Sequence, residues 1–291
     1  MPVLLFGVSP AGIAEPATPG GPDFALYCPG WRLIRRYTSQ ALALPTTERT
    51  LRDSFGPDAP SDLSDFQRLI EAYLSINSHA KVWDRTSYPA IVGLASDVYQ
   101  FGAVKAKTFY PAILKEASIL RIDPDNAQAK AALQAVLTTL GTAAQTLADK
   151  AETVVGQLRE FGSQTAADRL VLIGTNDRAG LTEYYNDRYG PGGPESFSGY
   201  GLAELDVDLA NAQLGTALAA IFKVQQAWAG IGATLTTAAG LLAGSVANAL
   251  PVIANLDVDK AVFGWQDVAA VADDFRTHAF QTRDELASSP V

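Results

Sequence analysis

The sequence predicts an all-α protein, an elongated antiparallel bundle of about five helices, some longer than 30 residues, with a mid-chain loop. Three observations predict this fold. Alanine, the residue with the highest intrinsic helix propensity, is abundant, as in VLTTLGTAAQTLA at 136–148. Apolar residues recur at helical spacing over long segments. The alternation of apolar and polar residues that is typical of strands is almost absent.

The composition limits the function classes. A chain of 291 residues can bury a substantial core, and its single cysteine, Cys28, excludes an intramolecular disulfide. With only two histidines, His79 and His278, we expect no metal site and no cofactor. Twenty-two basic and 31 acidic residues give a net charge of −9, which opposes the release of counterions that drives nucleic-acid binding. We therefore expect no nucleic-acid partner.

The N-terminal segment is rich in glycine and proline. We expect residues 1–30 to form an extended arm and residues 31–291 to form a single helical-bundle domain. No basic residue precedes the short apolar run near the N-terminus, so there is no recognisable secretory signal. The expectation is a soluble protein that is released or exported by a non-classical route.

The first half of the domain has clear helix boundaries. A helix is expected over 31–44, before Pro45, followed by a short one that contains Glu48 and Arg52. Ser64-Asp65-Phe66-Gln67 has the pattern of a capping box and predicts the start of the next helix. A long helix is expected from about residue 89 to 123, kinked at Pro111.

The second half contains the most regular pattern. Apolar residues keep the i, i+3, i+4, i+7 spacing throughout 126–161, and about 36 helical residues would span about 54 Å. Further helices are expected over 202–235 and 264–286. Between the helix at 126–161 and the one that starts at 202, at about 169–201, we expect a tip or loop, because 174–201 contains a Gly-Pro-Gly-Gly-Pro turn cluster. Its tyrosines are candidates for recognition by stacking, or for holding the loop in place: Tyr184, Tyr185, Tyr189 and Tyr200.

Residues 224–256 contain no charged side chain, which allows two interpretations. The length exceeds the roughly 20 residues that cross a bilayer, but four glutamine or asparagine residues, several glycines and Pro251 lower the hydrophobicity. A helix that is apolar all round belongs either in a core or in a membrane. Before any family argument, a helix buried inside a bundle is the favoured interpretation.

The sequence has no sign of an enzyme. It contains no HExxH, GxSxG, Walker or GxGxxG motif, so we expect neither a nucleotide site nor catalysis. His79 and His278 each lie near an aromatic residue on an expected helix, where a packed or surface histidine is the ordinary interpretation. A spatial pairing of either histidine with an aspartate stays open, because sequence does not reveal it.

Four segments carry a resemblance to a known family. They are WRLIRRYTSQALALPTTERTLRDSF at 31–55, VWDRTSYPAIVGLASDVYQFG at 82–102, FKVQQAWAGIGATL at 222–235 and FGWQDVAAVADDFRTHAF at 263–280. In order and spacing they resemble helices of the nematicidal helical class of Cry crystal toxins. That class is part of the cytolysin A family of α-helical pore-forming toxins, which includes the components of haemolysin BL. The likeness covers about half the chain.

The resemblance implies a tail domain of about five long helices and a head domain inserted mid-chain, whose hydrophobic tongue first contacts the membrane. An N-terminal helix then lines the pore of a ring-shaped oligomer. By this mapping, residues 224–256 lie mostly in the core. Where the head should lie, this chain has only RLVLIG at 169–174 and a polar loop, so the loop stands in place of a full head domain.

Two functions follow as expectations. The first is a pesticidal or cytotoxic protein that acts on target-cell membranes, alone or as one component of a multi-part toxin. Its partners would be a target-cell membrane or receptor, further copies of this chain, or a partner toxin component. The candidates for membrane contact lie in two segments: Leu170, Val171, Leu172 and Ile173, and then Leu241, Leu242, Val252 and Ile253. The second is a non-lytic binding or scaffold protein that kept the toxin tail fold.

Overall fold

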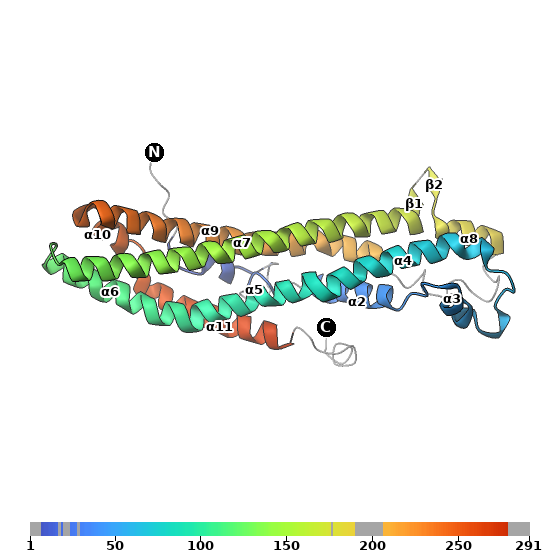
Figure 1. Cartoon of the computed structure of the whole chain (residues 1–291), viewed down its shortest axis with the longest axis horizontal. Coiled ribbons are helices and arrows are strands. Elements are labelled where there is room, and N and C mark those ends of the chain that lie inside the picture. The colour runs from blue at the N-terminus through green and yellow to red at the C-terminus, as the bar shows by residue number, and fades with distance from the viewer. Residues whose placement is uncertain are drawn as a thin grey trace. The chain divides into compact units, whose positions relative to one another are not determined.

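The computed structural model describes residues 7–16, 19, 24–27, 30–175, 177–189 and 206–278, and it confirms the all-α class (Figure 1). Two compact units make up the chain. Unit 1 takes Met1–Cys28, Ala90–Val155 and Ala219–Val291, and unit 2 takes Pro29–Pro89 and Gly156–Leu218. Helices α7 (Ala127–Leu172) and α9 (Val207–Gly244) contribute residues to both units. At 46 and 38 residues, they confirm the expectation of helices longer than 30 residues.

The other described helices are shorter. In chain order they are α1 (Ala11–Ala14), α2 (Gly30–Leu42), α3 (Glu48–Phe55), α4 (Gln67–Val82), α5 (Tyr88–Gln100), α6 (Lys107–Ile122), α8 (Leu181–Tyr189), α10 (Val246–Ala254) and α11 (Val258–His278). Short 3-10 turns, η1 (Gly56–Asp58) and η2 (Ser64–Phe66), connect α3 to α4. Figure 1 shows the chain reversing direction in the short turn between α6 and α7.

Helices α4, α5 and α6 follow one another without a break, through two π-helical segments, η3 (Trp83–Ser87) and η4 (Phe101–Ala106). The sequence predicted a start near Pro89 instead. A proline ring clashes with the carbonyl group four residues earlier, which is that of Arg85 for Pro89 and of Lys107 for Pro111. Arg85 lies within η3 and Lys107 directly follows η4. The wider π-helical turns therefore coincide with the places where each proline needs room.

The core of unit 1 is centred on three aromatic side chains from different helices. Trp228 of α9 stacks on Trp265 of α11 with ring centroids 5.1 Å apart, and Phe101 of η4 lies 4.8 Å and 4.7 Å from the two. Trp265 Nε1 and the Tyr110 hydroxyl both donate hydrogen bonds to the backbone oxygen of Val8, each at 2.9 Å. These bonds attach the N-terminal segment to the core.

The described part of the N-terminal segment differs from the expected extended arm. It contains the single helical turn α1, and the side chains of Ile13, Phe24 and Leu26 are fully buried. The sequence pattern emphasised the conformational effect of glycine and proline in this segment. Burial of these large apolar side chains, each contributing about 1.5–3 kcal/mol, outweighs that local preference.

The uncharged run forms α10 and the C-terminal half of α9. Trp228, Leu235 and Leu242 on α9 are all buried. Two glycines allow α7 and α9 to approach closely, since a Cβ on Gly232 would lie 3.3 Å from the Gly141 carbonyl oxygen. This half of α9 thus packs in unit 1, as the favoured interpretation expected.

The core of unit 2 surrounds Trp83, which is 1% exposed. Its ring centroid lies 4.5 Å from that of Phe161 on α7, 6.3 Å from that of Trp31 on α2, and 6.1 Å from that of Tyr88. Phe161 also contacts Tyr37, at 6.4 Å. Aromatic contacts thus join α2, the α4–α5 junction and α7.

The predicted capping box at Ser64 is wrong. Ser64 begins the 3-10 turn η2, and its backbone nitrogen donates to Asp62 Oδ1 instead of its side chain capping α4. The capping box of this region lies at the start of α3, where Thr47 Oγ1 accepts from the Thr50 nitrogen at 3.2 Å and Thr50 Oγ1 accepts from the Thr47 nitrogen at 3.0 Å. Threonine replaces the usual glutamate at the third helical position, so the usual sequence pattern of a capping box does not reveal this one.

Candidate functional site

Exposed aliphatic side chains gather at the carboxyl end of α7, in unit 2. Leu170, Val171 and Ile173 are 51%, 48% and 43% exposed, while Leu172 between them is only 2% exposed. A single exposed aliphatic residue is ordinary, but three within four positions at one helix end form a cluster. We call Leu170, Val171 and Ile173 the α7 patch.

A tight hairpin follows the α7 patch at once. Strands β1 (Gly174–Thr175) and β2 (Arg178–Ala179) pair antiparallel, so the described part of the predicted loop contains a hairpin and then helix α8. Gly174 has a φ of +86°, and a Cβ there would lie 2.2 Å from the Arg178 carbonyl oxygen. A Cβ on Gly180 would lie 2.4 Å from the Leu172 carbonyl oxygen. Only glycine fits these two positions, which fold the hairpin back against the end of α7.

Helix α8 is attached to the start of α4. The fully buried Tyr185 stacks on Phe66 at 5.3 Å with nearly parallel rings, and its hydroxyl donates to the Asp65 carbonyl oxygen at 2.8 Å. Arg188 pairs with the Asp65 carboxylate at 2.7 Å. These contacts position the other face of α8 toward a cavity.

The cavity has a volume of about 1000 Å³ and lies between α4, the end of α7, β2 and α8. Leu170 and Val171 of the α7 patch form part of its wall. Charged and aromatic side chains complete the wall; among them are Arg68, Glu71, Arg178, Tyr184, Asp187 and Arg188. The cavity thus borders both aliphatic groups and cations.

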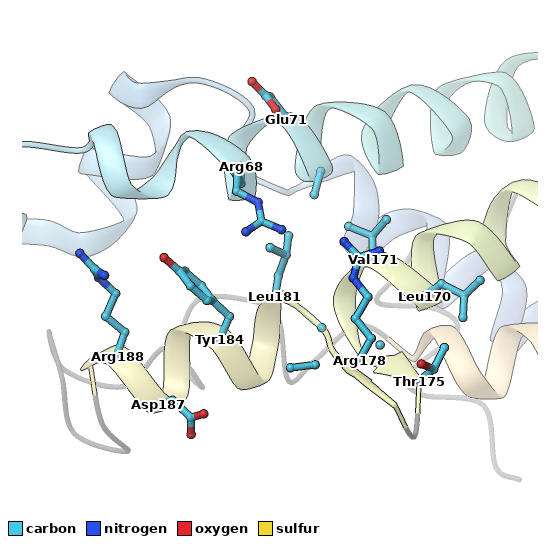
Figure 2. A pocket seen from close by; sticks show the side chains of 14 residues that line it. Arg68, Glu71, Leu170, Val171, Thr175, Arg178, Leu181, Tyr184, Asp187 and Arg188 are labelled. Carbon is cyan, nitrogen blue, oxygen red and sulfur yellow. The ribbon is translucent and has the colours of Figure 1, made fainter.

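Figure 2 shows that positively and negatively charged side chains around the cavity point in different directions. The side chains of Arg68 and Arg178 point into the space between α4 and the hairpin, whereas the carboxylates of Glu71 and Asp187 point away from it. The Arg68 guanidinium lies over the Tyr184 ring, 5.6 Å from its centroid. Within the described residues, Arg178 forms no ion pair. The cavity is therefore locally cationic in a chain of net charge −9.

The four candidate tyrosines have different surroundings. Tyr184 is 37% exposed on the cavity wall, and Tyr185 is fully buried beneath α8, so it pins the segment. The side chain of Tyr189 and the whole of Tyr200 lie outside the described residues. Of the two that can be placed, only Tyr184 offers a surface for recognition.

A buried polar cluster lies one helical turn or less before the α7 patch. The Asp168 carboxylate, only 5% exposed, lies 3.0 Å from His79 Nδ1 of α4 and accepts a hydrogen bond from the Tyr37 hydroxyl of α2 at 3.4 Å. Burial raises the pKa of Asp168, and the hydrogen bond and charge of His79 oppose that rise. Burial also raises the pKa of Tyr37. This cluster joins three helices and realises the pairing of a histidine with an aspartate that the sequence left open.

The second candidate segment lies in unit 1. Leu242 and Ile253 are buried, while Leu241 and Val252 are half-buried. Among the described residues, one helix, α9, is long and apolar enough to cross a membrane. Within its most apolar 18-residue stretch, 44% is buried. Leu242 and Ile253 contact a membrane only if α9 and α10 leave the core.

The cationic side of the cavity was not predicted from the sequence. Arg68, Arg178 and Arg188 come from three different elements, and no spacing in the sequence indicates that they meet. Gly174 and Gly180, at either end of the short segment 175–179, were the available signal for a hairpin. Among the described residues, no group of three His, Cys, Asp or Glu side chains lies close enough together to hold a metal ion.

Comparison with known proteins relates this site to a toxin family. Residues 61–181 match the model of the Bacillus haemolytic enterotoxin (HBL) family. The resemblance to α-helical pore-forming toxins is confirmed over these residues. The matched segment is shorter than half the chain; it begins three residues before η2 and runs through α7 and the hairpin to the first residue of α8. It therefore includes the α7 patch and most of the cavity wall.

Solved structures and curated proteins provide two further comparisons. A solved structure described as the Bacillus cereus HblL1 toxin component aligns with a TM-score of 0.43 and 14% identity, over 98% of this chain and 90% of that chain. No sequence among the curated proteins matches this one. Of the four segments that carried the resemblance, 82–102 lies within the matched residues. The closer likeness to the nematicidal Cry class stays a prediction.

Proposed function

We propose that this protein is a cytotoxic or pesticidal protein of the α-helical pore-forming type, which acts on target-cell membranes without enzymatic chemistry. It acts alone or as one component of a multi-part toxin, with copies of itself or separate components as partners. The observation that carries the proposal is the match of residues 61–181 to the haemolytic enterotoxin family.

The α7 patch supports a membrane role for that matched segment. Three aliphatic side chains remain about half exposed to water although neighbouring Leu172 is buried. Burying apolar surface contributes about 25 cal/mol per Å², so an interfacial position would stabilise these groups. The patch is too short to span a bilayer. We therefore propose that it makes the first membrane contact and that any insertion involves other segments.

Leu241, Leu242, Val252 and Ile253 are the proposed second contact. Because Leu242 and Ile253 are buried in unit 1, they would reach lipid only after a conformational change. Leu241 and Leu242 lie at the end of the candidate span α9, which ends at Gly244, and Val252 and Ile253 lie in α10. In the proposed order of events, the α7 patch contacts the membrane first, and this second segment contacts it afterwards.

The test is dye release from liposomes made of lipid extracts of target cells, at neutral and at acidic pH, with the protein alone. The variant Val171→Asp places a charge in the α7 patch. Its matched control is Val104→Asp in unit 1, because Val104 is 52% exposed and Val171 is 48% exposed. We expect dye release by the wild type and by Val104→Asp, and a loss of release of at least tenfold by Val171→Asp.

Equal release by both variants would remove the α7 patch from the mechanism. An absence of release under every condition would exclude a pore-former that acts alone, and vesicle binding would then decide between the remaining functions. A subunit of a multi-part toxin still binds vesicles. The non-lytic binding protein, with the exposed Tyr184 as its contact surface, does not.

A further inference from the structure

The wall of the cavity beside the α7 patch carries two kinds of group, apolar and cationic. A membrane surface presents a complementary partner for each of them. Leu170 and Val171 supply aliphatic surface, and Arg68 and Arg178 supply positive charge, all on the wall of one cavity. A lipid offers acyl chains and, next to them, a phosphate group. This arrangement is the one by which interfacial segments engage membranes, with apolar groups inward and cations at the headgroups.

The orientation of the charges favours an anion in the cavity. Arg68 and Arg178 point into it, and the carboxylates of two residues on its wall, Glu71 and Asp187, point away (Figure 2). Neither arginine forms an ion pair within the described residues, and the Arg68 guanidinium lies over the Tyr184 ring. Two cations directed into one cavity repel each other, and an anion between them removes that repulsion.

The chemistry of the side chains indicates which anion. The guanidinium group of arginine is planar and presents paired donors that match phosphate oxygens in a bidentate way. Both cations here are arginines. Arg188, at the other end of the wall, already pairs with Asp65 and contributes mainly to holding α8 in place.

We propose that this cavity binds the phosphate of an anionic phospholipid headgroup, through Arg68 and Arg178, while the α7 patch contacts the acyl chains beside it. The inference rests on the proposed membrane function and gives it a lipid class. It predicts binding to anionic membranes even though the chain as a whole is acidic. Local charge, within about 8 Å at physiological salt, thus determines the binding rather than net charge.

The experiment measures flotation with vesicles of phosphatidylcholine alone and of phosphatidylcholine mixed with phosphatidylserine. The test variant is Arg68→Gln with Arg178→Gln. The matched control is Arg85→Gln with Arg121→Gln, which removes the same charge from two exposed arginines that do not line the cavity. Each cation at an anionic surface contributes about fivefold to affinity, so the test variant should bind mixed vesicles about 30-fold more weakly. The control should bind within about twofold of the wild type.

The outcomes separate this inference from the function it rests on. Phosphatidylcholine also carries a phosphate, but its choline cation offsets that charge. Equal binding of the wild type to both vesicle types would therefore overturn the site for an anionic headgroup and leave the membrane function standing. Binding to neither would overturn both. If the test and control variants weaken vesicle binding equally, net charge alone accounts for the effect. That result would overturn the site. A calorimetric titration with inorganic phosphate covers the remaining source, because tight binding of free phosphate would reassign the cavity to a soluble anion.

Discussion

The close packing of η4 against α11 in unit 1 leads to a prediction in which two chemically identical substitutions have opposite effects. A Cβ added at Gly102 would lie 2.5 Å from the Trp265 carbonyl oxygen and 3.0 Å from the Ala269 Cβ. A Cβ added at Gly93, in α5, would meet nothing within 4 Å. Gly102→Ala and Gly93→Ala therefore differ mainly in steric overlap.

The magnitude follows from two contributions. Replacing glycine by alanine in a helix stabilises by about 0.5–1 kcal/mol, and this gain applies to both sites. Overpacking against a backbone atom, which cannot turn aside as a flexible side chain does, costs about 1–3 kcal/mol and applies only at Gly102. Gly93→Ala should therefore be stabilised, and Gly102→Ala should be less stable than Gly93→Ala by about 1–3 kcal/mol.

The assay is thermal unfolding followed by far-UV circular dichroism. For a chain of this size, each 1 kcal/mol changes the Tm by about 2–4 °C, so the two variants should differ by several degrees. Near-UV spectra give a second measurement, because the Gly102 clash bears on the backbone of Trp265, whose ring stacks on Trp228. Equal Tm values with unchanged near-UV spectra would refute the close approach of η4 to α11.

Two further predictions concern unit 2. Because burial raises the pKa of Asp168, the folded state holds that proton more tightly than the unfolded state. The stability of the wild type relative to Asp168→Asn should therefore fall as pH rises from the ordinary aspartate range through the raised pKa, by up to about 1.4 kcal/mol per pH unit. Urea titrations across that range measure it, and a relative stability that is flat or increasing would contradict the raised pKa. Thr47→Ala should destabilise the start of α3 by about 0.5–2 kcal/mol. Hydrogen exchange at the Thr50 amide should accelerate accordingly, and Thr47→Ser should restore its protection; unchanged exchange would contradict the cap.

The helices were predictable because their signal is local. The spacing of apolar residues predicted the helical region at 126–161 correctly, and the structure extends it to Leu172. The extension was missed because Leu170, Val171 and Ile173 form, with Leu172 between them, a continuous apolar run, which breaks the helical spacing. Their exposure is the reason that the spacing fails: a helical residue outside the core has no need to follow the pattern.

The capping interactions show the opposite limit. The Ser64 motif satisfied the usual pattern but its side chain does not cap α4, whereas Thr47 and Thr50 cap α3 without that pattern. A capping box is a hydrogen-bond geometry, and several pairs of side chains can form it. Sequence therefore locates helix starts approximately and does not decide which oxygen meets which amide.

The candidate site combines what sequence can and cannot reveal. The residues of the α7 patch were among the candidates for membrane contact in the sequence, because an uninterrupted apolar run is visible in one segment; their exposure was not predicted. The cation pair was not predicted, because Arg68 and Arg178 lie more than 100 positions apart in the sequence and meet only through the hairpin and α8.

That hairpin depends on Gly174 and Gly180, and α8 depends on the stacking of Tyr185 on Phe66. A change at any of these positions should therefore alter the cavity without touching either arginine. The membrane contact and the headgroup site consequently share one structural support. The α7 patch adjoins the hairpin at Gly174, and Arg178 lies within it, so a displaced hairpin would separate the aliphatic groups from the cation and weaken both interactions together.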